Sequence, residues 1–232
     1  MIKALKKELV LLVFLSSIMS IASDLHPISL PVTGMVADDL WVNEIGSPTT
    51  SIFINDNLEV DNNGEETAIL NDFIHSVANG QSDEIRGIIM EDSIALNVIP
   101  QPAGQPAFVS SVVNVITEFS IPRKFGVIGF LAHNYLAGRF FYDIKFDDIV
   151  KIVYGDGEIL KYKVIDIQKY QALQPNSPHS EFLDLNTLQK LSATQLFQKV
   201  YTGDHHITLQ TCIQEGTLDT WGRLFIIAEP VA

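Results

Sequence analysis

Residues 149–170, IVKIVYGDGEILKYKVIDIQKY, indicate the fold class of this chain. Two segments rich in β-branched and aromatic residues, 149–154 and 158–170, flank the triplet Gly155-Asp156-Gly157. Their partial alternation of apolar and polar residues predicts a strand on each side, and the glycine-bounded triplet predicts a tight turn. The sequence therefore predicts a β-hairpin here.

Further segments with the same enrichment predict strands at residues 87–90, 94–99, 109–115, 125–132, 206–212 and 223–228. One helix stands out among them, because Ser192 opens a Ser-Ala-Thr-Gln capping box and Gly203 follows as a helix stop. Many strands joined by turns, with one clear helix, favour a closed β-barrel over a βαβ fold. We expect a mainly β protein with one or a few short helices.

Charge is distributed unevenly along the 232 residues. Residues 24–92 hold 14 acidic residues and one basic residue, and the whole chain has a net charge of −13. Such a chain lacks the basic surface that binds phosphates, so no nucleic acid partner is expected. We interpret residues 24–83 as an acidic N-terminal extension and residues 84–232 as the barrel domain. Apolar residues at helical spacing predict a helix within residues 65–78.

The first 23 residues have the pattern of an export signal. Three lysines precede an apolar run at residues 9–22, which ends in the small-x-small pattern Ser20-Ile21-Ala22. At ~1.5 Å per residue, this run is shorter as a helix than a ~30 Å hydrocarbon core. We expect a cleaved signal peptide, with a retained signal anchor as the alternative. The protein is then extracytoplasmic, either secreted or attached to the membrane through its N-terminus.

Cys212 is the single cysteine, which excludes an internal disulfide and a cysteine-rich metal site. It closes the run Ile207-Thr208-Leu209-Gln210-Thr211-Cys212, in which apolar and polar residues alternate. A free thiol in an exported protein is open to oxidation, so it persists where its reactivity is used or where it is an inert core residue. A nucleophilic thiol needs an imidazole that stabilises the thiolate and protonates the leaving amine.

His133 is the best candidate for that imidazole, because it ends the apolar run 125–132 as Cys212 ends its own. The two can meet at one rim of a barrel. The other five histidines are weaker candidates. His205 and His206 lie too far from Cys212 along the same predicted strand. His26 and His75 lie in the acidic extension, and His179 lies in a proline-containing loop. Arg223 opens the next predicted strand. A hairpin would set it opposite Cys212, where a fixed cation can stabilise an oxyanion.

At these residues the chain resembles the sortase family of cysteine transpeptidases. Thr208-Leu209-Gln210-Thr211-Cys212 matches the family's Thr-Leu-x-Thr-Cys motif, and Ala132-His133-Asn134 matches the context of its histidine. Arg223 matches the arginine of the following strand, and the order His, Cys, Arg is the same. The resemblance covers about residues 84–230.

The resemblance implies a closed eight-stranded β-barrel outside the membrane. It also implies that Cys212 attacks the carbonyl of a sorting-signal threonine in an exported protein, and that His133 protonates the leaving amine. Arg223 would hold the substrate and its oxyanion, with Thr211 beside Cys212 as a further candidate for this contact. An amine of peptidoglycan or of another protein would then release the thioester. No cofactor and no metal is implied.

Two other functions stay open at this point. An L,D-transpeptidase-like cross-linking enzyme also depends on Cys, His and Arg, but its Ser-x-Gly-Cys-x-Arg pattern does not occur around Cys212. A non-catalytic sortase-like binding module would keep the fold with an inert thiol. Labelling of the thiol across pH discriminates the last case, because an inert thiol shows no dependence on His133.

Overall fold

The computed structural model describes residues 52–53, 62–91, 93–177 and 179–231. The strands are β1 (Ile52–Phe53), β2 (Ile85–Met90), β3 (Ile94–Pro100), β4 (Val115–Phe119), β5 (Ile128–Leu131), β6 (Ile149–Tyr154), β7 (Ile159–Ala172), β8 (Phe182–Asp184), β9 (Lys190–Leu191), β10 (Ile207–Glu215) and β11 (Leu218–Pro230). The helices are α2 (Asn62–Val77) and α3 (Ala193–Tyr201), with two short 3-10 helices, η2 (Pro122–Phe125) and η3 (Ala137–Tyr142).

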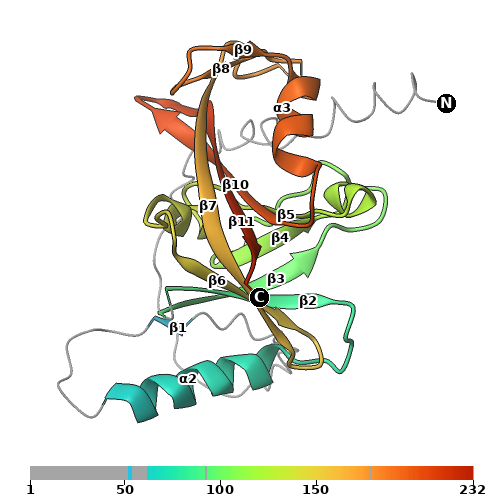
Figure 1. Ribbon diagram of the computed structural model, residues 1–232, viewed down its shortest axis with the longest axis vertical. Helices are drawn as coiled ribbons and strands as arrows, with labels where there is room; N and C mark the ends of the chain where they lie inside the picture. The colour runs from blue at the N-terminus through green and yellow to red at the C-terminus, as the bar shows by residue number, and fades with distance from the viewer. Residues whose placement is uncertain (1–51, 54–61, 92, 178, 232) are drawn as a thin grey trace, which may run out of the picture.

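Eight of these strands close into a barrel (Figure 1). Their order is β7-β11-β10-β5-β4-β3-β2-β6, and β6 pairs back onto β7. The pairs β3–β4 and β5–β10 are parallel and the other barrel pairs are antiparallel. Strands β8 and β9 extend the sheet from β7, outside the barrel. The expected mainly β fold with a closed eight-stranded barrel is confirmed.

The hairpin that indicates the fold class forms as expected. Strand β6 pairs antiparallel with β7, and the carbonyl of Glu158 accepts the N–H of Tyr154 across the turn. Gly157 has a φ of +90°, a backbone conformation that glycine adopts without steric cost. The local sequence thus determines this turn.

Alternation along the strands separates two hydrophobic clusters. An inner core fills the barrel and includes Ile88, Phe130, Leu209, Leu224 and Ile226. An outer cluster lies on the other face of β5, β10 and β11, and includes Leu131, Phe197, Tyr201, Phe225 and Ile227. Because side chains point alternately to the two faces of a strand, odd and even positions of β10 belong to different environments.

Helix α3 covers the outer cluster. The expected capping box is present: Ser192 Oγ accepts the N–H of Gln195 at 3.3 Å, and Gln195 Oε1 accepts the N–H of Ser192 at 2.9 Å. The helix buries Leu196, Phe197 and Tyr201 against the sheet.

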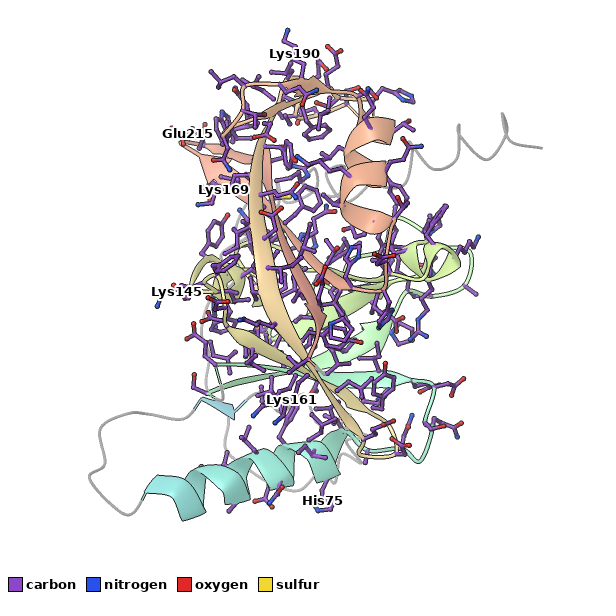
Figure 2. The ribbon with its side chains drawn as sticks, viewed as in Figure 1. His75, Lys145, Lys161, Lys169, Lys190 and Glu215 are labelled. Carbon is purple, nitrogen blue, oxygen red and sulfur yellow. The ribbon has the colours of Figure 1, made fainter. Side chains whose placement is uncertain are left out.

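Helix α2 packs on the outside of the barrel, over β2 and β3. Phe73 and Val77 are buried with Ile89 and Ala95 of the strands, at the helical spacing that predicted this element. The ring of Phe73 comes so close to Gly87 that a Cβ there would lie 2.8 Å from it. His75, on the exposed side of the helix, lies at the opposite end of the molecule from Glu215 in the β10–β11 hairpin (Figure 2).

The expected strand at 109–115 is wrong, and the strand in this region is β4, which begins at Val115. The N–H of Val112 donates to Ser110 Oγ, and the N–H of Ser110 donates to Thr117 Oγ1. Asn114 has a φ of +60°, which a strand does not contain. The serine hydroxyl therefore closes a turn where the sequence shows β-branched residues.

Other strand limits also differ from the sequence expectation. Strand β5 begins at Ile128 rather than 125, because Pro122 starts η2 and Gly126 ends it with a φ of +79°. Strands β10 and β11 run on to Glu215 and back from Leu218, so no long loop separates Cys212 from Arg223. Cys212 consequently lies within a paired strand and does not end it.

The expected leader and residues 24–51 and 54–61 of the acidic extension lie outside the described residues. Among the helices that are described, none is both long enough and apolar enough to cross a membrane.

Candidate active site

Cys212 and Arg223 face each other on neighbouring strands, as the expected hairpin requires. The carbonyl of Gln210 accepts the N–H of Ala132, so the backbone groups of Gln210, and of Cys212 two residues on, point toward β5. Cys212 and Arg223 therefore form a non-hydrogen-bonded pair, with Cα atoms ~4.5 Å apart and side chains close together. The pairing brings the sulfur and the guanidinium to one face of the hairpin.

That face is the outer one. Leu209 and Leu224 point into the inner core, whereas Phe225 belongs to the outer cluster. By alternation, Cys212 and Arg223 lie on the same side as Phe225. The expectation that the site residues meet at the barrel rim is thus refined: they lie on the outer wall, next to the cluster covered by α3.

His133 reaches the same place from β5. This strand is parallel to β10, with Leu131 opposite Gln210. His133 follows Leu131 by two residues, so the alternation of β5 directs it to the outer side as well. A small pocket, named here the thiol pocket, is lined by Val109, Leu131, Ala132, His133, Gln210, Thr211 and Cys212. His133 and Cys212 are thus brought together across 79 residues of sequence.

The imidazole of His133 is partly buried in this pocket. Burial lowers its pKa below the ordinary value of 6.5, and a hydrogen bond to the carbonyl of Val109 opposes this shift. The ring of Tyr135 stacks on the imidazole, with centroids 5.3 Å apart and an interplanar angle of 20°. The ring is therefore oriented from two sides, by one hydrogen bond and one stacking contact.

Arg223 is almost completely buried, with 1% of its surface exposed. Its Nη1 donates to the carbonyls of Thr220 at 3.1 Å and Gly222 at 2.8 Å. Tyr170 of β7 lies opposite Arg223 on its other side and is itself buried. The guanidinium is thus a fixed cation beneath the surface and not a mobile side chain at a strand start.

Thr211 lines the thiol pocket, but its hydroxyl is already engaged. Oγ1 donates to the carbonyl of Ala132 at 2.8 Å, and the side chain is buried. A Cβ on Gly138 would lie 2.3 Å from this oxygen and 2.7 Å from the carbonyl of His133. Only glycine fits at 138, where η3 crosses the end of β5.

Two tyrosines that sequence reasoning missed contact the site. Tyr135 stacks on His133, and Tyr142 Oη donates to the carbonyl of Cys212 at 2.6 Å. Tyr135 lies two residues from His133, so proximity in sequence could have indicated it. Tyr142 is 70 residues from Cys212, and no spacing signal connects them.

The remaining described histidines have other surroundings. His205 Nε2 is bonded to the Tyr162 hydroxyl at 3.0 Å and its Nδ1 to the Gly126 carbonyl at 2.8 Å. His206 is bonded to backbone carbonyls before β10. Both precede β10, which begins at Ile207 rather than at residue 206. Among the residues that the structure describes, no three His, Cys, Asp or Glu side chains gather closely enough to hold a metal ion.

Comparison with known proteins gives matches among solved structures alone. No family model matches the chain, and no curated protein matches it. Sortase A from Corynebacterium diphtheriae is 18% identical, with a TM-score of 0.43, over 74% of this chain and 70% of that chain. Sortase C from Clostridium perfringens SM101 is 16% identical, with a TM-score of 0.39, over 75% and 93%.

Sortase C-1 from Actinomyces oris is 18% identical, with a TM-score of 0.41, over 77% of this chain and 92% of that chain. Each of these three solved structures is a sortase, and each is similar to this chain at low sequence identity.

Proposed function

We propose that this protein is a sortase-like cysteine transpeptidase that acts outside the cytoplasm. One observation carries the proposal: a thiol, an imidazole and a buried guanidinium come from three separate segments to one outer face of the barrel. Cys212 and His133 line the same pocket, and Arg223 is the cross-strand neighbour of Cys212. The five-residue motif that ends in Cys212 and the order of the three residues agree with the family pattern.

The first half of the reaction is acylation of Cys212. The thiolate sulfur attacks the backbone carbonyl of a sorting-signal threonine, and a carbon–sulfur bond forms while the carbonyl electrons move to oxygen. Arg223 favours this oxyanion, because a buried cation is screened weakly by water. As the intermediate collapses, the carbon–nitrogen bond breaks and His133 gives a proton to the leaving amine.

The second half transfers the acyl group. An amine of peptidoglycan or of another protein attacks the thioester carbonyl, and His133 takes up its proton as the sulfur leaves. Both substrates are exported or surface-located, in agreement with the signal-like N-terminus. Attachment to the membrane through that N-terminus would hold the enzyme next to its substrates.

A direct test combines the full chain with peptides copied from the C-termini of exported proteins of the same genome, plus an amine. We expect an acyl adduct on Cys212, detected by mass spectrometry and released by hydroxylamine. Cys212→Ala should form neither adduct nor transfer product, and His179→Gln, in an exposed loop, is the matched control. Full activity in a folded Cys212→Ala variant would refute the proposal, and an unreactive thiol in the wild type would favour a binding module.

A further inference from the structure

Tyr142 ends η3 beside the nucleophile. Its hydroxyl donates to the carbonyl oxygen of Cys212 at 2.6 Å, and 44% of the residue surface is exposed. Burial of the phenol raises the pKa of Tyr142 above its ordinary value of 10.0. The phenol therefore keeps its proton at neutral pH and stays a hydrogen-bond donor.

The bond from Tyr142 to Cys212 lies just beyond the point where the pairing of β5 with β10 ends. The ladder between β5 and β10 is parallel and ends with the N–H of Ala132 on the carbonyl of Gln210. The next carbonyl of β10 that points toward β5 is that of Cys212, two residues on. With β5 turned away at His133, the hydroxyl of Tyr142 takes the place of the next backbone donor.

The turn that carries His133 also fixes Tyr142. The carbonyl of His133 accepts the N–H of Leu136 at 3.0 Å and the N–H of Gly138 at 2.9 Å. Gly138 in turn packs against Thr211, the neighbour of Cys212. The imidazole, the phenol and the cysteine backbone are therefore parts of one connected unit.

We propose that Tyr142 is a positioning residue for acyl transfer at Cys212, a role that rests on the function proposed above. The N–H and C=O of one strand residue point to the same side, so a bond that holds the carbonyl of Cys212 in strand geometry also keeps its N–H on that side. That N–H then points toward the end of β5, on the same side of β10 as the carbonyl. There it can donate to the oxyanion that forms when the sulfur attacks a carbonyl.

Two small probes separate this role from a purely structural one. With p-nitrophenyl acetate as substrate, the Cys212 sulfur attacks the ester carbonyl carbon and an oxyanion forms. p-Nitrophenolate then leaves and the thioester remains on the enzyme. With iodoacetamide as reagent, the sulfur displaces iodide from carbon and no oxyanion forms. Both reactions use the same thiol in the full-length protein, and Cys212→Ala gives the background rate.

We expect Tyr142→Phe to lower the rate constant of the p-nitrophenolate burst about tenfold, with KM unchanged, because an oxyanion donor is misplaced. Its alkylation by iodoacetamide should stay within about twofold of the wild type, because that transition state carries no oxyanion. Tyr154→Phe, on a strand that does not pair with β10, is the matched control and should leave both rates unchanged.

The rates of Tyr142→Phe with the two probes test the positioning role of Tyr142. Equal losses with the two probes, or no loss with either, would overturn the positioning role and leave the transpeptidase proposal intact. A wild-type protein with no burst that depends on Cys212 would overturn both the proposed function and this inference.

Discussion

Two opposing effects act on the pKa of a single residue, His133. Burial in the thiol pocket lowers its pKa, while the carbonyl of Val109 favours the protonated ring. A partly buried imidazole with a lowered pKa accepts the thiol proton less readily, yet donates it more readily to a leaving amine. In the proposed transpeptidase, this lowered pKa would favour the step in which His133 protonates the leaving amine.

The pH profile follows from this environment. Activity requires one proton to have left the thiol–imidazole pair, so kcat/KM falls as the pH decreases through the pKa of His133. Because burial lowers that pKa, we expect the midpoint of the acidic limb to lie below 6.5. The measurement is the p-nitrophenyl acetate rate across the acidic and neutral range. A midpoint at or above 6.5 would contradict the assignment, and His179→Gln should leave the limb in place.

Gly138 gives a second prediction at this scale. A methyl group there would meet the hydroxyl of Thr211 at 2.3 Å and the carbonyls of His133 and Ala132 at 2.7 and 2.9 Å. Backbone atoms cannot move aside cheaply, so Gly138→Ala should lower the free energy of unfolding by about 1–3 kcal/mol. Urea unfolding measures the loss. Combining the change with Thr211→Ala should restore part of it, and an unchanged midpoint in the single variant would be evidence against this packing.

At the scale of elements, sequence patterns succeed where structure is determined locally. The capping box at Ser192 and the glycine turn between β6 and β7 depend on a few neighbouring residues, and both form as predicted. The continuation of β10 beyond Cys212 depends on pairing with β11 across a tight turn at Gly216, which has a φ of +58°, and hydrophobic alternation does not mark this turn. The bond from Tyr142 to Cys212 depends on where β5 ends, so no local pattern could reveal it.

The capping box offers a test of α3. Ser192→Ala removes the side-chain acceptor for the N–H of Gln195, so the free energy of unfolding should fall by about 1 kcal/mol. Gln198→Ala, at an exposed position of the same helix, is the control, because alanine is a good helix former and nothing buried is lost. Thermal unfolding of the two variants compares them. Equal stability would show that the cap does not hold the helix in place.

At the scale of the whole molecule, the sequence indicates a mainly β barrel because hydrophobic alternation recurs along it. Positions at predicted strand ends indicated Cys212, His133 and Arg223, which the fold brings to one face, and the resemblance added the number of strands and the expected roles. Alternation alone could not decide between a rim and an outer wall, because that depends on which face α3 and β8 cover. The barrel therefore has two hydrophobic layers, and the candidate site borders the outer one.

The packing of helix α2 on the barrel leads to a prediction about the stability of the whole protein. Phe73 is fully buried against the barrel, next to Gly87 and Val153. Phe73→Ala should lower the free energy of unfolding by about 3–5 kcal/mol. Hydrogen exchange should report faster opening of both α2 and β2 in the variant. Asp72→Ala, at an exposed position, is the control, and an effect of Phe73→Ala restricted to α2 would show that the helix is docked only weakly.

The position of Cys212 inside a paired strand has a consequence for the order of events in catalysis. The backbone of Cys212 pairs with β11 and is bonded by Tyr142, so its short side chain cannot carry an acyl group from one place to another. In the proposed transpeptidase, the sorting-signal donor and the amine acceptor must therefore react at the same sulfur in turn. The leaving polypeptide has to depart before the amine enters, which makes ping-pong kinetics the expected behaviour.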